Sequence, residues 1–333
     1  AALRRQWWRL RTVEQVVVGS TRRAEMGGCG EGAQDQCRAA GGGGGRQARV
    51  HRSARGRRAG ASAGARVSPR VLAVIPALDE AASIGATVAA LRAQVPPPAA
   101  VVVADGGSRD DTARLAEAAG ARVVRCGREM RGRASQMNAG AAAAVEAVGA
   151  RPDDILIFVH ADTQLPAGAL EAAAASTARI GEGFAVGAFR CHIESGAGRT
   201  GPLLRLASLN HQLKSHYLPA LLRPRAFAQG LRVFYGDQSI FVRVGTFESC
   251  GGYDASLALM EDADLCVRAH ATTRERSGKA VCEQLSERVR TSARRFERRG
   301  WVHTTLAQLA VGLAWTAGVS NETLENIVTR VYA

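Results

Sequence analysis

Acidic residues stand at the ends of three short apolar runs in the first half of the chain. VLAVI is followed by PALDE, which contains Asp79 and Glu80; VVVA is followed by Asp105; and IFVHA is followed by Asp162. Carboxylates that gather at one place repel one another unless a cation or basic side chains compensate them. Carboxylate oxygens, with an occasional imidazole such as that of His160, suit Mg²⁺ or Mn²⁺, and such an ion commonly bridges a carboxylate and a substrate diphosphate. The alternative is that each Asp is a solvated loop residue where its strand ends.

A second acidic group lies in the segment LMEDADL and consists of Glu261, Asp262 and Asp264. Acidic side chains favour a helix N-terminus because their charge opposes the helix dipole, which accounts for the group without any chemistry. Adjacent acids that follow the flexible GGYD segment also suit a general base at the junction between a loop and a helix. The residues alone leave both interpretations open.

Basic side chains that could neutralise phosphate oxygens lie in two segments. GRASQMNAG contributes Arg133, with Asn138 as a polar neighbour, and TSARRFERRGW contributes Arg294 and Arg295. A solvated run of charge is the simpler explanation of the second segment. Both segments nevertheless carry the cations that a diphosphate would need.

The segment DGGSRDDT predicts a turn from a strand into a helix. Its glycines permit a tight turn, and Ser108 with Asp111 three residues later forms a capping-box pattern. That explanation does not cover Asp105, an acid directly at the end of a buried strand, which could accept hydrogen bonds from a base or a ribose. The segment matches neither the glycine pattern of dinucleotide-binding sites nor the P-loop, so neither of those sites is supported.

The elements that must position these residues are the strands and helices of an α/β sheet. Runs rich in β-branched residues at 71–75, 99–105, 121–125 and 154–160 alternate with Ala-rich stretches of helical length. This alternation predicts a mostly parallel sheet, in which ligands sit beyond the carboxyl ends of the strands. After residue 180 the pattern predicts a long strand at 184–194, an amphipathic helix at 201–222 and another strand at 237–243. A short helix is predicted after GGYD, and an apolar C-terminal helix at 303–318.

Most of the net charge of +14 lies in the first 68 of the 333 residues. That stretch carries 14 Arg against four acids, which leaves the rest of the chain at only +4 and argues against a nucleic-acid partner. Much of the stretch is rich in Gly and Arg without large apolar residues, so we predict a disordered leader. It fits a transit peptide to a plastid or mitochondrion, with translated flanking sequence or a nonspecific basic tail as alternatives; without such a signal we expect a cytoplasmic protein.

The cysteines and the apolar segments also bear on the compartment. Seven scattered Cys without a C-x-x-C pair indicate reduced thiols in a cytosol-like environment. No window contains 18 apolar residues, so no helix is predicted to span a membrane. The C-terminal helix has the apolar character of a peripheral membrane contact, although packing against the body is the favoured interpretation.

Seven motifs, in this order and spacing, resemble glycosyltransferase family 2. They are VIPALDE, DGGSRDDT, GRASQMNAGA, FVHADTQLP, YGDQSIFVR, GGYDASLALMEDADL and TSARRFERRG. The resemblance is greatest to a branch of small bacterial-type enzymes that carry HADT in place of Asp-x-Asp. It implies a GT-A fold, a nucleotide-sugar donor, a divalent metal (Mg or Mn) and an inverting, hexosyltransferase-type activity. It also implies three parts of the chain: a disordered basic leader at 1–68, a GT-A domain at 69–300, and an apolar helix at 301–333 packed on that domain.

Positions that match the family motifs receive roles from the resemblance. Asp162 matches the metal-binding end of Asp-x-Asp, with His160 in place of the first Asp. Asp262 matches the catalytic base, with Glu261 as the fallback. The segment 292–296 resembles the Gln-x-x-Arg-Trp signature of processive relatives, with Ser for Gln and Phe for Trp, which argues against processive polymer synthesis. Contacts to the nucleotide sugar are implied for Pro76, Asp79, Glu80, Asp105, Arg133, Asn138, Asp237, Arg294 and Arg295.

The predicted reaction is transfer of a sugar from a nucleoside diphosphate sugar to an acceptor hydroxyl. Metal-dependent nucleotidyl transfer is the alternative among enzymes; it would consume a nucleoside triphosphate and release pyrophosphate. A catalytically silent nucleotide-binding or scaffold protein is the alternative outside enzymes. The presence of both Asp162 and the Glu261–Asp262 pair speaks against the silent protein, which needs neither a base nor a metal ligand.

Overall fold

A computed structural model of the chain describes residues 68–127, 130, 132–195, 201–320, 322–324 and 326. The residues from Ser68 onward belong to one compact unit. The leader predicted at 1–68 lies outside the described residues apart from Ser68, and so does its predicted role as a transit peptide. None of the helices in the described ranges combines the length and hydropathy that a membrane-spanning segment needs.

An eight-stranded sheet runs through this unit in the order β3-β2-β1-β4-β7-β6-β8-β5. The first four strands are parallel, with β1 paired to β2 and to β4, and β2 paired to β3. They are short because their apolar runs are short, and every residue of β1 and β4 is buried, as expected for parallel strands covered on both faces. Their bounds are Val71–Ala77 for β1, Ala100–Asp105 for β2, Arg122–Arg125 for β3 and Ile155–Phe158 for β4.

The second half of the sheet is mixed. β7 pairs antiparallel with β4 and with β6, whereas β8 runs parallel to β6 and carries β5 antiparallel on its outer edge. This arrangement confirms the predicted fold class, a GT-A type α/β sheet with flanking helices and a mixed C-terminal half. The bounds are Thr163–Gln164 for β5, Phe184–Glu194 for β6, Phe241–Arg243 for β7 and Val281–Ser292 for β8.

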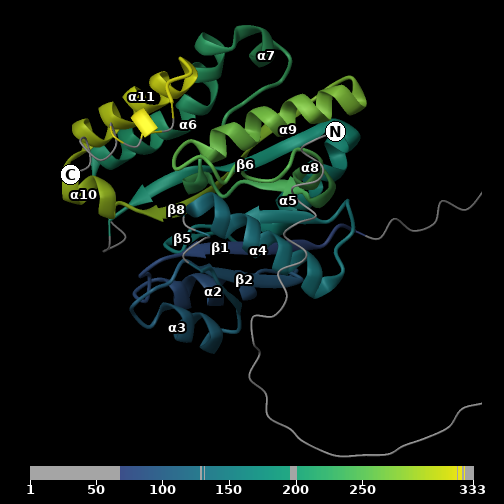
Figure 1. The fold of residues 1–333 in the computed structure, drawn as a ribbon, viewed down its shortest axis with the longest axis vertical. Coiled ribbons are helices and arrows are strands. Elements are labelled where there is room, and N and C mark those ends of the chain that lie inside the picture. Colours follow the sequence, from purple (N-terminus) through teal and green to yellow (C-terminus); the bar gives the residue numbers. More distant parts are fainter. Residues whose placement is uncertain are drawn as a thin grey trace, which may run out of the picture. The chain divides into compact units, whose positions relative to one another are not determined.

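Helices cover both faces of the sheet (Figure 1). Buried residues of α2, α3 and α5 form one apolar core with alternate residues of β1, and those of α4, α8 and α9 form another core with the intervening residues of β1. This division follows from the period of two along a strand. The bounds are Ile84–Arg92 for α2, Thr112–Ala118 for α3, Arg133–Val148 for α4, Ala169–Ile180 for α5, Val244–Ser249 for α8 and Glu261–Ser277 for α9.

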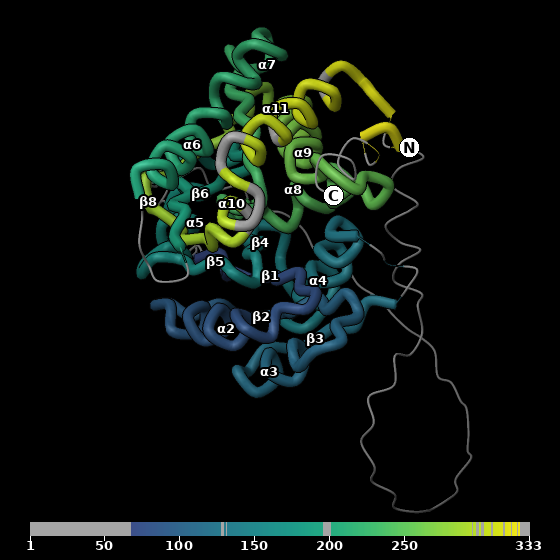
Figure 2. The backbone as a smooth tube through the Cα atoms, turned by 90° about the vertical axis from the view of Figure 1, so that its left-hand side faces the viewer, coloured from purple at the N-terminus to yellow at the C-terminus, as the bar shows by residue number. Residues whose placement is uncertain are grey.

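Four further helices lie around β6 and the C-terminal end of β8. α6 packs against β6, and α11 lies beside α6 in both views of the fold (Figures 1 and 2). Their bounds are Pro202–Leu222 for α6, Pro224–Ala228 for α7, Arg294–Arg299 for α10 and Trp301–Thr316 for α11.

Close packing of α4 on β1 depends on Gly140. A Cβ atom at this position would lie 2.5 Å from Cγ1 of Val74, too close for a side chain. The Ala-rich helix therefore sits directly against the strand, and its first residue, Arg133, is placed at the carboxyl end of β1, where the acidic residues of PALDE follow.

Two segments differ from their predicted form. The strand predicted over 237–243 begins only at Phe241, because the preceding Gly236–Gln238 forms a 3₁₀ turn (η4) and Ser239 is left-handed, with φ of 49°. The helix after GGYD, predicted to be short, is α9 with 17 residues. Its charged C-terminal half hides the helical pattern, and it ends at the left-handed Gly278.

Candidate active site

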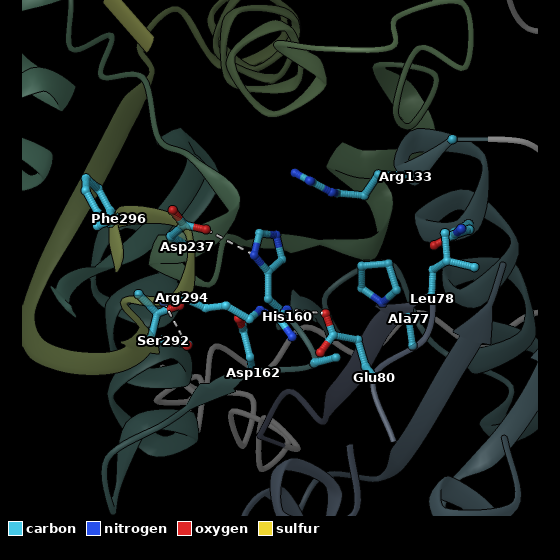
Figure 3. A pocket seen from close by; sticks show the side chains of 15 residues that line it. Ala77, Leu78, Glu80, Arg133, His160, Asp162, Asp237, Ser292, Arg294 and Phe296 are labelled. Carbon is cyan, nitrogen blue, oxygen red and sulfur yellow. Dashed lines mark hydrogen bonds and ion pairs between the residues drawn. The ribbon is translucent and has the colours of Figure 1, made fainter. Parts of the chain in front are cut away.

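A polar cavity of about 520 Å³ lies at the carboxyl ends of β1 and β4 (Figure 3). PALDE supplies Pro76 and Glu80, the end of β4 supplies His160 and Asp162, and the beginning of α4 supplies Arg133. The end of β8 and the beginning of α10 close the cavity with Ser292, Arg294 and Phe296. We call this the first cavity.

Arg294 lies between two of the three carboxylates that line the first cavity. Its Nη2 lies 2.6 Å from Oε1 of Glu80 and 3.7 Å from Oδ2 of Asp162. Burial raises the pKa of Asp162, and the neighbouring His160 acts in the opposite direction. One guanidinium thus compensates two acids that come from different strands, which is the cation that such a cluster requires.

His160 stands at the inner wall and is held there by Asp237. The Nδ1 of His160 lies 3.1 Å from Oδ1 of Asp237, and the other carboxylate oxygen lies 3.3 Å from Nε2 of His211. Burial acts to raise the pKa of Asp237, but the hydrogen bonds from the two imidazoles hold it well below its usual range. An ionised Asp237 fixes the tautomer of His160 and leaves Nε2 of that ring facing away from it; this buried atom makes no hydrogen bond within the described residues.

A second cavity of about 480 Å³ begins on the other side of His160. It shares Arg133, His160 and Asp237 with the first cavity. The remaining wall comes from α6, the segment before η4, the beginning of α9 and α11. It combines apolar and aromatic side chains with polar ones, and its members include Tyr217, Leu218, Tyr235, Met260, Leu309 and Val311 as well as Asn210, His211, Lys214 and Thr305.

Glu261 and Asp262 begin α9 at the floor of the second cavity. Oδ2 of Asp262 accepts a hydrogen bond of 2.8 Å from the backbone N–H of Gly236, while its Oδ1 is buried without a partner in the described part of the chain. Oε1 of Glu261 lies 3.3 Å from Nη1 of Arg133. The neighbouring Met260 is left-handed, with φ of 64°, and this sharp entry into the helix turns both acids inward.

The environment raises the pKa of both acids. Burial and then the charge of Asp262 raise the pKa of Glu261 to about 7, against the opposing effect of Arg133. Burial likewise raises the pKa of Asp262, with Arg133 and His160 acting against it. Two adjacent buried carboxyl groups beside one guanidinium retain a proton close to neutral pH, which is the range where a general base is effective.

Gly236 brings the two catalytic neighbourhoods together. A Cβ atom at this position would lie 2.2 Å from Nε2 of His160 and 3.0 Å from Oδ2 of Asp262. Only glycine allows the backbone to pass between the imidazole and the carboxylate. The YGDQ turn therefore holds His160 through Asp237 and Asp262 through the N–H of Gly236.

Residues 72–244, just over half of the chain, match the sequence profile described as glycosyl transferase family 2. The chain belongs to this family. No curated protein matches the chain. Among solved structures, glucosyl-3-phosphoglycerate synthase from Mycobacterium tuberculosis with Mn²⁺, UDP-glucose and phosphoglyceric acid is similar at 21% sequence identity, covering 76% of this chain and 81% of that chain with a TM-score of 0.48. The complex of the same protein with Mg²⁺ and UDP is similar at 20% identity, covering 76% and 80%, with a TM-score of 0.47.

Most of the residues predicted for the site of this family 2 glycosyltransferase line one of the two cavities. The first cavity is lined by Pro76, Glu80, Arg133, His160, Asp162, Asp237 and Arg294, and the second by Glu261 and Asp262 together with three of these. The side chain of Arg295 lies outside the described part of the structure. Its predicted contact with the nucleotide sugar stays a prediction.

Three predicted residues of the glycosyltransferase line neither cavity. Oδ1 of Asp79 accepts a hydrogen bond of 2.7 Å from the N–H of Arg109, and the carboxylate of Asp105 accepts hydrogen bonds from the N–H and hydroxyl of Ser108. Both acids thus hold the turns that follow β1 and β2. Asn138 donates to the carbonyl of Tyr253 at 2.8 Å and accepts from its N–H at 2.9 Å, so it fixes the GGYD loop ahead of the Glu261–Asp262 pair.

The residues that motif matching missed lie on α6. His211, Lys214 and Ser215 are polar side chains on the buried face of this helix, where His211 contacts Asp237 and Lys214 lies 3.9 Å above the ring of Tyr235. Their spacing of three and four residues puts them on one face, together with the buried Leu218. Polar residues at the buried positions of an amphipathic helix were the signal that could have revealed them.

The residues that could hold a divalent cation are Asp162 and His160. No group of three or more His, Cys, Asp and Glu side chains within the described ranges has the arrangement of a complete metal site. One carboxylate completed by substrate phosphate oxygens and water is, however, the usual way in which Mg²⁺ is bound. Asp162 projects into the first cavity and therefore fits a cation that arrives with the donor, whereas the unpartnered Nε2 of His160 is buried on the side of Gly236 and Asp262.

Proposed function

We propose that this glycosyltransferase moves a sugar, of hexosyl type, from a nucleoside diphosphate sugar to an acceptor hydroxyl and inverts the anomeric carbon. The observation that carries the proposal is the meeting of two cavities at His160, Asp237 and Arg133. One cavity holds cation-compensated carboxylates, and the other holds a buried acidic pair with raised pKa values. A donor and an acceptor in these cavities face each other across the same three side chains.

The first cavity is assigned to the donor. Arg294 and Arg133 supply positive charge for the phosphate oxygens, and Asp162, with His160 beside it, would hold the divalent cation. When bound, that cation compensates the charge that develops on the departing diphosphate. Guanidinium groups add to this compensation because their fixed N–H groups match phosphate oxygens.

The second cavity is assigned to the acceptor, with Asp262 as the general base. The acceptor hydroxyl gives its proton to Oδ1 of Asp262, the buried oxygen without a partner. Its oxygen then bonds to the anomeric carbon while the bond from that carbon to the diphosphate breaks, and the diphosphate leaves with the electron pair. Because the attacking oxygen arrives from the second cavity and the diphosphate departs into the first, the two bonds lie on opposite faces of the carbon. Attack and departure on opposite faces invert it.

Further features support a finer assignment. From HADT at 160–163 we infer that the chain belongs to the branch of family 2 that carries this motif in place of Asp-x-Asp. Ser292 and Phe296 stand where processive relatives carry Gln and Trp, which supports a single transfer in each cycle. Both residues line the first cavity, so the departure from the processive signature falls within the donor site.

The decisive experiment presents the purified full chain with a panel of UDP-, GDP- and other nucleotide sugars, together with Mn²⁺ or Mg²⁺. Release of a nucleoside diphosphate from one donor supports the proposal, and the sugar product is then examined for its anomeric configuration. Release of pyrophosphate from a nucleoside triphosphate would instead establish nucleotidyl transfer. Binding of a nucleotide sugar without turnover under any condition would establish a silent binding protein.

A further inference from the structure

Exposed apolar side chains are concentrated on two neighbouring helices. Twelve large apolar side chains are exposed in the described part of the chain, and nine of them lie on α6 and α11. Random exposure would spread them over all elements, whereas a contiguous apolar surface marks an interaction site. We call these nine side chains the α6–α11 face: Leu203, Leu206, Leu209, Leu213, Tyr217, Leu221, Leu306, Leu309 and Leu313.

The spacing of these residues produces a stripe along each helix. On α6, Leu206, Leu209, Leu213, Tyr217 and Leu221 follow one another at intervals of three and four residues, and Leu221 is 73% exposed. Residues at these intervals occupy one side of a helix.

On α11 the intervals from Leu306 to Leu309 and Leu313 are the same, and Leu306 is 59% exposed. Ala307 and Val311 on the same helix are buried, so α11 already has a packed side. The leucines on its other side are additional to that packing. Since α6 and α11 contact each other, the two stripes are carried by neighbouring helices (Figure 2).

Basic side chains predominate around this face, with Glu297 on the adjacent α10 as an exposed acid. Residues 202–228 and 301–316 contain no Asp or Glu. Arg205 near the beginning of α6 and Arg223 and Arg225 beyond its end are exposed, so basic side chains stand at both ends of the apolar stripe. Apolar residues flanked by arginines, without acids, are complementary to a bilayer that carries anionic headgroups. A protein surface of mixed charge would not be matched in this way.

The face continues into the second cavity. Tyr217 and Leu309 are exposed members of the face and also line that cavity, whose floor is the Glu261–Asp262 pair. The face therefore adjoins the cavity that contains Asp262, whose wall also carries the polar side chains of Asn210, His211, Lys214 and Thr305. A molecule with a hydrocarbon part and a hydroxyl-bearing head would meet the apolar side chains of the face with its hydrocarbon part and the polar side chains of the cavity, Asp262 among them, with its head.

We propose that the α6–α11 face docks on an anionic lipid bilayer and that the acceptor is a membrane amphiphile whose hydroxyl reaches Asp262 through the second cavity. The part concerning the acceptor rests on the proposed function, whereas the docking can be measured without any activity. Docking in the plane of the surface agrees with helices that are too short or too polar to cross a membrane within the described ranges. It also gives the exposed leucines an apolar environment, which is their main source of binding free energy.

The first test is cosedimentation of the full chain with vesicles of phosphatidylcholine and phosphatidylglycerol. Two double variants, Leu206→Glu with Leu213→Glu and Leu306→Glu with Leu313→Glu, change the face without touching a cavity-lining residue. Val95→Glu is the matched control, because Val95 is 78% exposed on the loop after α2, away from α6 and α11 (Figure 1). We expect both double variants to lower the partition coefficient at least about tenfold, and Val95→Glu to leave it unchanged.

The Arg-rich leader is present in every variant and could bind anionic vesicles by itself. Sedimentation is therefore repeated at raised salt, which screens the leader's charge but leaves apolar burial intact. Equal sedimentation of all variants at raised salt would overturn the proposal. A second result would also overturn it: the wild-type chain elutes as a dimer, and the double variants elute as monomers but sediment with vesicles like the wild type. The face would then bind a second copy of the chain.

The second test uses a long-chain alcohol with a photoreactive diazirine in its alkyl chain, incorporated into the same vesicles. Illumination should attach it to peptides of α6 and α11, and the double variants should lose this labelling. Labelling only of other peptides, or none, overturns the assignment of the acceptor class. The two proposals can fail separately. If the chain turns over a donor but all variants bind vesicles equally, only the docking proposal is removed. If the double variants lose vesicle binding but the chain turns over no donor, only the proposed function is removed.

Discussion

The two cavities that meet at His160 are built from different kinds of structure. The first lies at the ends of short parallel strands, and its walls carry Glu80, Asp162 and Arg294 in an ion-paired cluster. The second lies among helices, and its walls combine apolar and aromatic side chains with Asn210, His211, Lys214 and Thr305, above the buried acids at its floor. The site therefore has one cavity whose charged side chains suit a charged ligand, and a second cavity that buries its acidic pair away from water. Substitutions should separate accordingly, into those that affect the donor and those that affect the chemistry of the acceptor.

The largest effect is expected from Asp262→Asn in the second cavity. General-base assistance is typically worth about 10² to 10⁴ in rate, so kcat should fall at least about 10²-fold while donor affinity stays within about twofold. Nucleotide release and donor titration by calorimetry measure the two quantities. Asp264→Asn is the matched control, because this acid is two residues further along α9, pairs with Arg268 and lines neither cavity. An unchanged rate in Asp262→Asn would contradict the assignment of the base.

A smaller effect, on donor affinity rather than on kcat, is expected from Asp162→Ala in the first cavity. Loss of the cation ligand should weaken donor binding in the presence of Mn²⁺ or Mg²⁺ by at least about tenfold. Titration of the donor with and without EDTA checks this, because the variant and the wild type should bind the donor alike once the metal is removed. Activity that survives both the substitution and EDTA would exclude a metal-assisted transfer.

The pH profile should report the acidic pair of the second cavity. A carboxyl group must be ionised to act as a base, and burial raises the pKa of Asp262 above its ordinary value, so kcat should fall about tenfold for each pH unit below the pKa of Asp262. Glu261→Gln removes a neighbouring carboxylate charge and should move this acidic limb of the kcat profile to lower pH. A limb that stays in place in this variant would show that the pair does not control the rate.

The free energy of unfolding should fall as pH rises, whereas kcat should increase. Between the ordinary value of 4.5 and about 7, folded Glu261 holds a proton that the unfolded chain releases. The free energy of unfolding therefore falls as pH rises through this window, and Glu261→Gln should flatten that fall. Urea unfolding of the wild type and of Glu261→Gln on both sides of the window measures the difference.

The smallest effect is expected from the ion pair at the mouth of the first cavity. Arg294 is about half exposed, so Arg294→Gln should change the free energy of unfolding by less than about 1 kcal/mol. The same variant should raise the KM for the donor several-fold, because the phosphate oxygens lose a guanidinium partner. A large loss of stability with an unchanged KM would show that Arg294 is a structural residue rather than a donor contact.

The first cavity could be predicted from the sequence to a greater extent than the second. Apolar runs that end in PALDE and HADT predicted parallel strands, and parallel strands bring their carboxyl ends to one edge, so Glu80 and Asp162 were expected to be neighbours. The structure also places Asp237 and Arg294 there, at positions that the family motifs marked. Local pattern and global topology agree in this half of the molecule.

The second cavity could be predicted only at its floor. Glu261 and Asp262 were recognisable because acids at the beginning of a helix form a local pattern. Its walls come from α6 and α11, whose leucines have the same spacing whether they are buried or exposed, so composition could not separate packing from a free surface. The roles of Asp105 and Asn138 depend on which partner each side chain contacts, and a motif does not specify that: the structure places them against Ser108 and Tyr253.

Gly236 and Asp237 are consecutive residues of one tight turn, and each holds a group that belongs to a different substrate: the N–H of Gly236 holds Asp262, and the carboxylate of Asp237 holds His160. A ligand that moves His160 must move the turn, and the turn carries the base with it. By linkage, a donor that shifts this turn changes the affinity for the acceptor by the same factor by which the acceptor changes the affinity for the donor. Under the proposed function, the coupling between the two substrates therefore passes through a single peptide unit.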